Sequence, residues 1–261
     1  MNITEYVEKF GHLSFDEAPF NEADSLVMAQ MAYLNWDLIL PKVGTEDKHF
    51  KLFKSVPDKL NVALNAGEFD SKKSEKLFLL MKKSKRFGES KARFVSRIDD
   101  LEKHTQFFAL TITLPNGLDV ISFRGTDLTL NGWIEDTMLC FEDEIPSQRE
   151  AVDYVDKVTS ILRGPFIMVG HSKGGNLSYY AAMMMKKAHK ERLINAYSFD
   201  GPGFFSEQIY ETDEYAESRK KMIKYIPVDS IVGMMLNHDD NVQVVDSINV
   251  GVFQHDPFSW T

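Results

Sequence analysis

The sequence predicts an α/β fold in which helices cover a mostly parallel central sheet. From about residue 150 onward, short apolar runs rich in β-formers alternate with segments of helical periodicity. This alternation is typical of strands joined by helical crossovers. A length of 261 residues suits one large domain, 1–261, and 43% hydrophobic residues are enough to bury a sizeable core.

The N-terminal part begins with helical periodicity and continues with a hairpin. The segment "FNEADSLVMAQMAYLNW" has a broad apolar helical face, and Asn21 or Asp24 is its candidate cap. Strand texture starts at "ARFVSRIDDL". Further on, two β-branched runs flank Pro115-Asn116-Gly117, and an Asn-Gly pair between such runs predicts a β-hairpin.

Residues 41–90 have a different texture, with many lysines and apolar residues at helical intervals, as in "KLFLLMKK". We expect two or three short amphipathic helices, broken at Pro57 and Gly67. They predict a helical cap or insertion within the N-terminal part of the domain. A solvated helical insert without a role at a pocket explains the pattern equally well.

The second half predicts the elements of the parallel sheet in order. Expected helices and strands alternate as "SQREAVDYVDKVTSIL", "PFIMVG", "GNLSYYAAMMMKKAHK", "INAYSF", "SEQIYETDEYAESRKK" and "MIKYIPV". The strand-like runs "NVQVVDS" and "INVGVFQ" follow, before a polar end.

Charge and composition exclude several classes of function. The net charge of −9 provides no broad cationic surface, so we expect no nucleic-acid partner. Cys140 is the only cysteine, which excludes an intrachain disulfide and favours a reducing, cytoplasmic location. The sequence contains no signal-peptide pattern and no apolar run long enough for a transmembrane segment. The oligomeric state does not follow from the sequence.

The segment from Gly170 to Gly174 matches the G-x-S-x-G pattern of a nucleophile turn, with His171 before and Lys173 after Ser172. A nucleophile on a tight strand-to-helix turn needs small residues two positions away on either side, because strand and helix pass close together. The expected strand precedes the motif and the expected helix follows it. We therefore predict that Ser172 is a nucleophile rather than part of a glycine-rich loop without chemistry.

A serine hydroxyl needs a general base, and the chain order in this architecture is serine, acid, histidine. Two histidines, His238 and His255, lie far enough along the chain. We favour His255, which follows a strand-like run and opens the loop "HDPFSW". His238 lies in the polar turn "NHDDN", where a solvated histidine is the simpler interpretation.

The acid and the oxyanion donors are predicted from strand ends. Asp229 follows "MIKYIPV" and Asp200 follows "INAYSF", and we favour Asp229 because the later strand is the usual source of the acid. One oxyanion donor is the backbone N–H of Lys173. The second is the N–H of Thr126, because the preceding Gly125 allows a close backbone approach.

Together these motifs resemble a known family. "VISFRGT", "NGWIEDT", "MVGHSKGGNL" and "IPVDSIVG" are similar to the class 3 lipases, which are α/β-hydrolases. In that family a tryptophan and an aspartate follow the oxyanion loop, and Trp133 and Asp136 match them. With "PFNEADSLVMAQMAYL" and "QHDPFSW", nearly the whole chain resembles an uncharacterised bacterial lipase-like family related to them. Class 3 lipases usually have an apolar or glutamine-like residue where this chain has Lys173.

The resemblance implies an α/β-hydrolase fold, a triad of Ser172, Asp229 and His255, and hydrolysis of a small-molecule acyl ester. Thioester or amide hydrolysis by the same residues, and ligand binding without turnover, stay open. Relatives continue further past His255, so we expect a sequence shortened at its C-terminus. No metal-binding or dinucleotide motif is present in the sequence, and we predict no cofactor.

Overall fold

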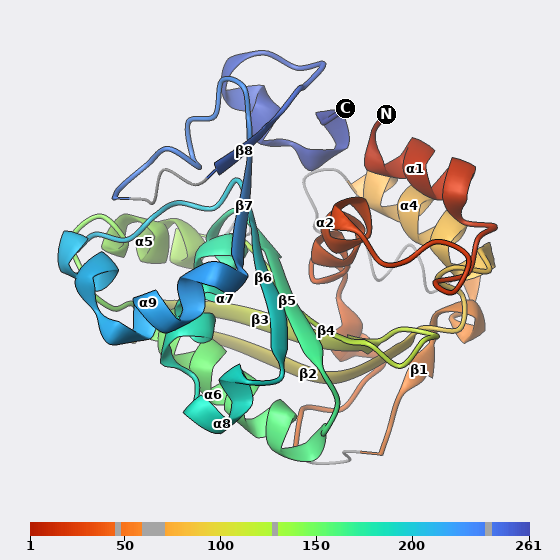
Figure 1. Ribbon diagram of the computed structural model, residues 1–261, viewed down its shortest axis with the longest axis horizontal. Coiled ribbons are helices and arrows are strands. Elements are labelled where there is room, and N and C mark those ends of the chain that lie inside the picture. The colour runs from red at the N-terminus through yellow and green to blue at the C-terminus, as the bar shows by residue number, and fades with distance from the viewer. Residues whose placement is uncertain (45–47, 59–70, 127–129, 238–241) are drawn as a thin grey trace.

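The computed structural model describes residues 1–44, 48–58, 71–126, 130–237 and 242–261. A twisted sheet runs through the centre, with helices on both of its faces (Figure 1). The strands follow one another across the sheet in the order in which they follow one another in the sequence. They are β1 (Lys51–Leu52), β2 (Lys91–Asp100), β3 (Thr105–Thr113), β4 (Asp119–Phe123), β5 (Phe166–His171), β6 (Leu193–Phe199), β7 (Met222–Pro227) and β8 (Val242–Val245).

The sheet has an antiparallel and a parallel half. Strands β1 to β4 are antiparallel to their neighbours, while β4 to β8 all run parallel. The predicted hairpin joins β3 to β4, where Gly117 has a φ of 84° and its N–H donates to the carbonyl of Leu114. The carboxyl ends of the parallel strands lie at one edge, which is where α/β folds carry their sites.

Helices form one layer on each face of the sheet (Figure 1). The first layer contains α1 (Ile3–Phe10), α2 (Glu22–Met31) and α4 (Ser71–Lys83). The second contains α6 (Pro146–Ile161), α7 (Lys173–Met184) and α9 (Asp213–Ser218), with α8 (Lys187–Lys190) after α7 and α5 (Leu130–Met138) against β3. Short 3₁₀ helices are η1 (Trp36–Leu38), η2 (Phe53–Ser55), η3 (Glu207–Glu211), η4 (Arg219–Lys221), η5 (Gly251–His255) and η6 (Pro257–Ser259). The predicted α/β fold is confirmed.

The expected helical cap at 41–90 is described only in part, because residues 45–47 and 59–70 lie outside the described residues. The described helix, α4, buries Leu77, Phe78 and Met81 in the core that α1 and α2 share with the sheet. Its apolar face therefore packs into the first helical layer. Any role of the masked remainder as a cap stays a prediction.

Two local predictions have opposite outcomes. Asn21 caps α2, because its side chain accepts from the N–H groups of Ala23 and Asp24. The prediction of a strand just before His255 is wrong, since Gly251–His255 forms the 3₁₀ helix η5. Its apolar side chains are exposed, and Gly251 adopts a φ of 55°, which a strand does not allow.

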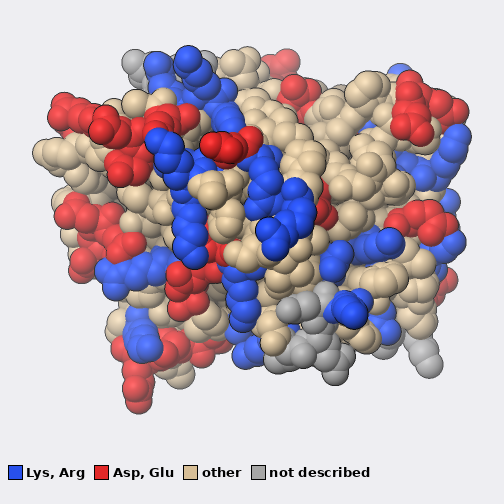
Figure 2. Space-filling view, turned by 60° about the horizontal axis from the view of Figure 1, so that its bottom comes forward, with Lys and Arg blue, Asp and Glu red and all other residues tan. Residues whose placement is uncertain are grey.

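Both signs of charge are present on the face in Figure 2. Basic side chains adjoin one another near the middle of this view, and acidic side chains lie to either side of them. No helix in the described part of the chain combines the length and the apolar character that crossing a lipid bilayer requires.

Candidate active site

Neighbouring strand ends bring the candidate residues together at the carboxyl edge of the sheet. In the β5–β6 register, His171 lies opposite Phe199, so the next residues, Ser172 and Asp200, emerge side by side. The backbone N–H of Ser172 donates to the carbonyl of Phe199 over 3.0 Å. The sheet therefore holds these two side chains at one place without any contribution from the loops.

Ser172 stands on a strained turn between β5 and α7. Its φ is 59° and its ψ is −134°, a combination that is costly for a residue with a Cβ atom. It is the N-cap residue of α7, and its carbonyl accepts from the N–H of Gly175 over 2.8 Å. Within the described residues no hydrogen bond to the Ser172 hydroxyl occurs. This is the backbone of a nucleophile turn, as the motif predicts.

Glycine is required at the positions around Ser172 because neighbouring backbone segments approach one another closely there. A Cβ atom at Gly170 would lie 2.0 Å from the carbonyl oxygen of Gly174, and one at Gly174 would lie 2.3 Å from that of Phe123. A Cβ atom at Gly125 would lie 3.0 Å from the Cβ of Ser172. The steric reason given for the motif therefore holds, and the loop after β4 passes directly against the nucleophile.

His255 lies beside the turn and is oriented by Asp200. Its Nδ1 is 2.6 Å from Asp200 Oδ2, and its ring centroid is 4.5 Å from that of His171. Because the carboxylate accepts only, Nδ1 carries the proton and Nε2 is left as the basic nitrogen. His238, the alternative base, lies outside the described residues.

The expected contact between Asp229 and His255 is wrong. Asp229 Oδ2 instead accepts from Gln254 Nε2 over 3.0 Å, and its N–H donates to Gln254 Oε1 over 2.9 Å. The reason is lateral position: β7, which precedes Asp229, is one strand further from β5 than β6 is. The carboxylate beside His255 is that of Asp200, the alternative that the sequence analysis ranked second.

Asp200 is held as a carboxylate. It is 1% exposed, and its Oδ1 accepts from the hydroxyl of Ser230 and from the N–H of Gly233. Burial by itself raises the pKa of Asp200, but the hydrogen bonds from His255 and Ser230 and the charge of His255 bring that pKa below its ordinary value. An ionised carboxylate in this position can stabilise an imidazolium.

Helix α5 ties down the two residues expected to provide oxyanion donors. The hydroxyl of Thr126 donates to Asp136 Oδ1 over 2.5 Å, and burial raises the pKa of Asp136. Lys173 Nζ lies 2.7 Å from Glu135 Oε2 and 3.1 Å from the carbonyl oxygen of Gln106. Lys173 is therefore a buried structural side chain, which explains why a lysine can follow Ser172.

Sequence reasoning missed several residues of the site. Glu135 adjoins the predicted Asp136 and shows no other signal, and Tyr33 contacts His171 from the segment after α2. Arg124, which precedes Gly125, donates through its guanidinium to the carbonyls of Ala32 and Leu34. These contacts join the first helical layer to the nucleophile turn.

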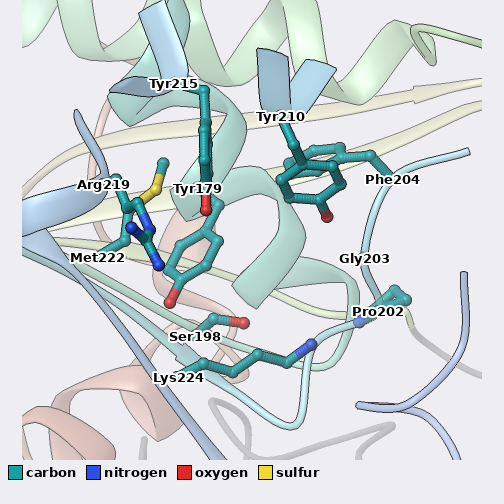
Figure 3. A pocket seen from close by; sticks show the side chains of 10 residues that line it. All are labelled: Tyr179, Ser198, Pro202, Gly203, Phe204, Tyr210, Tyr215, Arg219, Met222 and Lys224. Atoms are coloured by element: carbon teal, nitrogen blue, oxygen red, sulfur yellow. The ribbon is translucent and has the colours of Figure 1, made fainter. Parts of the chain in front are cut away.

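A cavity lies next to the site on the second helical layer (Figure 3). Tyr179, Phe204, Tyr210 and Tyr215 form aromatic walls, and the buried Lys224 lies at its floor. Lys224 Nζ donates to the carbonyl of Gly233 over 2.6 Å, and burial lowers the pKa of Lys224 to about 8. Gly233 thus connects this lysine to Asp200. Neither Ser172 nor His255 lines the cavity.

No group of three potential metal ligands occurs among the described residues. The edge of the sheet thus holds the strained turn of Ser172, at the N-terminus of α7, next to the Asp200 carboxylate that bonds the imidazole of His255, and such groups can serve nucleophilic chemistry.

Comparisons with known proteins address the family. No curated protein matches the sequence. A crystal structure of M37 lipase is 14% identical to this chain, with a TM-score of 0.47, and the match covers 82% of this chain and 69% of the lipase chain. A family model described as Mbeg1-like matches residues 81–261, which is more than half of the chain. The chain is therefore a member of the Mbeg1-like family, and its fold is of the α/β class.

Proposed function

We propose that this protein is a serine hydrolase that cleaves carboxylic esters through an acyl-enzyme. The observation that carries the proposal is the strained backbone of Ser172 beside an imidazole whose Nδ1 is bound to a buried carboxylate. A backbone conformation of this cost persists where surrounding structure enforces it, and such positions cluster at active sites. The triad that we propose is Ser172, His255 and Asp200.

In the first half-reaction Ser172 Oγ attacks the acyl carbon while His255 Nε2 takes the hydroxyl proton. The tetrahedral intermediate collapses as His255 gives that proton to the leaving alcohol. In the second half-reaction His255 takes a proton from water, the resulting nucleophile attacks the acyl-enzyme, and the proton returns to Ser172. Asp200 stabilises the imidazolium in both halves.

The oxyanion of both intermediates needs two donors. We propose the backbone N–H groups of Lys173 and Thr126. Lys173 is the first residue of α7, where backbone N–H groups have no partner within the helix and the helix dipole favours negative charge. Support for Thr126 comes from the contact of Gly125 with Ser172.

Exposed apolar side chains around the base favour an apolar acyl group. Ile248, Val250, Val252 and Phe253 precede His255 in the chain, and each is more than half exposed. Clusters of exposed apolar side chains usually mark binding surfaces. The triad itself serves esters, thioesters and amides alike, so this apolar rim is what directs the proposal to fatty esters.

A panel of p-nitrophenyl esters from acetyl to palmitoyl tests the proposal on the wild-type protein and on Ser172→Ala. We expect hydrolysis by the wild type and a loss of at least ~10³-fold in kcat for Ser172→Ala, because the nucleophile is removed. A fluorophosphonate probe should label the wild type at Ser172 only. Activity that survives in Ser172→Ala rejects the mechanism. A folded wild type that neither hydrolyses any ester nor labels favours a binding protein without turnover.

A further inference from the structure

We infer that His171, the residue before the nucleophile, is a positioning residue that holds the imidazole of His255 in place together with Tyr33. The inference rests on the proposed function, because the group that it positions is the proposed base. It assigns to the variable position of the G-x-S-x-G motif a role that the motif itself does not require.

The first step is the contact between the two histidines. His171 Nε2 lies 2.8 Å from the backbone carbonyl oxygen of His255, and the two ring centroids are 4.5 Å apart at an interplanar angle of 34°. His171 therefore contacts His255 at two places, namely the backbone carbonyl of His255 and the imidazole ring of His255. Asp200 holds the same imidazole through a hydrogen bond at Nδ1 of His255.

The second step is the protonation state of His171. A carbonyl oxygen can only accept, so the proton of the neutral ring is on Nε2. Nδ1 is then the acceptor for the hydroxyl of Tyr33, which lies 3.0 Å away. Tyr33 also donates to the carbonyl of His171 over 3.4 Å. The carbonyl of His255 therefore sets the tautomer of His171, and the hydroxyl of Tyr33 can donate to the Nδ1 that this tautomer leaves as an acceptor.

The third step concerns charge. His171 is 6% exposed; burial, followed by the charge of His255, lowers the pKa of His171 to about 3. His255 gains a proton in each half-reaction, and a second cation 4.5 Å away would oppose that gain. Because His171 stays neutral, it can keep its contact with His255 without opposing the protonation of His255.

Tyr33 itself is fixed from two sides. Arg124 donates to the carbonyls of Ala32 and Leu34, which flank it. A Cβ atom at Gly125 would lie 2.4 Å from the Tyr33 hydroxyl, so the loop after β4 packs against it closely. The positioning contact is thus anchored in the first helical layer rather than in a surface loop.

Three variants separate the parts of this contact. His171→Gln keeps an N–H donor and removes the ring, His171→Phe keeps a ring and removes the donor, and Tyr33→Phe removes a single hydroxyl. The matched control is His189→Gln, since His189 is a partly buried histidine whose Nδ1 bonds Asp156 away from the site. Of the three variants, we expect Tyr33→Phe to disturb folding least, because it removes only one hydroxyl.

The kinetic measurement is the rate at which a fluorophosphonate labels Ser172, together with kcat and KM for p-nitrophenyl butyrate. We expect both labelling rate and kcat to fall about 10- to 100-fold in the His171 variants and less in Tyr33→Phe, with KM nearly unchanged, because a small displacement of a catalytic group is costly. His189→Gln should behave as the wild type. Variants that label as fast as the wild type overturn the inference.

A measurement independent of activity is the long-range ¹H–¹⁵N spectrum of the histidine rings. We expect His171 as the Nε2–H tautomer without titration between pH 5 and 8, and altered His255 ring shifts in Tyr33→Phe. A titrating or Nδ1–H His171 overturns the inference. If the wild type does not label, the proposed function fails, and these spectra still decide whether His171 holds His255.

Discussion

Lys173 and Glu135 form a buried ion pair directly beside the nucleophile, with Nζ 2.7 Å from Oε2 and side chains 1% and 0% exposed. Glu135 also accepts from the backbone N–H groups of Gln106 and Ser147. Its carboxylate therefore joins α5, β3, the start of α6 and the turn of Ser172. The residue after the serine contributes its N–H to the proposed oxyanion hole and its side chain to this junction.

We predict that Lys173→Met lowers the free energy of unfolding by roughly 3–5 kcal/mol, because it leaves a buried carboxylate without its counter-ion. Urea unfolding followed by circular dichroism measures the change. Lys187→Met is the control, since Lys187 pairs with Glu217 on the surface, where solvent screens the pair and its contribution to stability is small. Equal losses of unfolding free energy in the two variants would show that burial of the Lys173–Glu135 pair does not increase its contribution to stability.

The choice of acid can be decided by one matched pair of variants. We predict that Asp200→Asn lowers kcat about 10³- to 10⁴-fold, because an amide can hold the wrong tautomer of His255 and cannot stabilise its charge. Asp229→Asn should lower kcat less than 10-fold, since Asp229 contacts Gln254. Ester hydrolysis at saturating substrate measures both. The reverse order of effects would restore Asp229 as the acid.

The close approach around Ser172 predicts a steric effect of single methyl groups. Gly125→Ala should lower kcat at least about 10-fold, because the new Cβ would lie 2.8 Å from the carbonyl oxygen of His171 and 3.0 Å from the Cβ of Ser172. Gly164→Ala is the control, because a Cβ atom there meets nothing within 4 Å. A Gly125→Ala protein with wild-type kcat would mean that the loop after β4 does not constrain the nucleophile.

Burial of neutral His171 predicts a pH dependence of stability. The pKa of His171 is about 3 in the folded protein, against 6.5 ordinarily, so the unfolded chain binds a proton that the folded protein does not. Stability from this source is present above pH 6.5 and is lost as the pH falls towards 3, at about 1.4 kcal/mol per pH unit.

The comparison between the wild type and His171→Gln isolates this contribution, because His255 and Asp200, which face His171, are present in both proteins. Urea unfolding at pH 7, 6, 5 and 4.5 should show a steeper loss of stability for the wild type. Parallel pH profiles would mean that His171 has the same pKa in the folded and the unfolded chain, so that burial does not lower it.

Which parts of the site were predictable depends on the range of the contacts involved. The turn of Ser172 follows from five consecutive residues whose spacing is dictated by local sterics, and the structure has that backbone. His255 was predicted from its place after the last strand-like runs, although the run before it is a 3₁₀ helix. Local pattern therefore predicted the turn of Ser172, while the roles of Ser172 as nucleophile and of His255 as base stay predictions.

The acid and its supports depend on the lateral arrangement of strands. Asp200 and Asp229 both follow a strand, and only the register between β5 and β6 shows that Asp200 emerges next to Ser172. Tyr33 and Glu135 reach the site across more than 30 residues of sequence, and no spacing rule connects them to it. For the same reason, the sequence pattern of α4 predicted an apolar face but not that this face packs into the first helical layer.

The apolar rim before His255 gives the last prediction, which concerns substrate length. Phe253→Ser should lower kcat/KM for decanoyl and palmitoyl esters roughly 5- to 30-fold, because an apolar contact of 1–2 kcal/mol with the acyl chain is lost. The acetyl ester has no acyl chain beyond its methyl group, so we expect its kcat/KM to stay within about twofold of the wild type. Ile194→Ser is the control, since Ile194 is exposed near the start of β6, at the other end of that strand from Asp200. A uniform loss across all chain lengths would show that Phe253 supports the position of His255 instead of contacting the acyl chain.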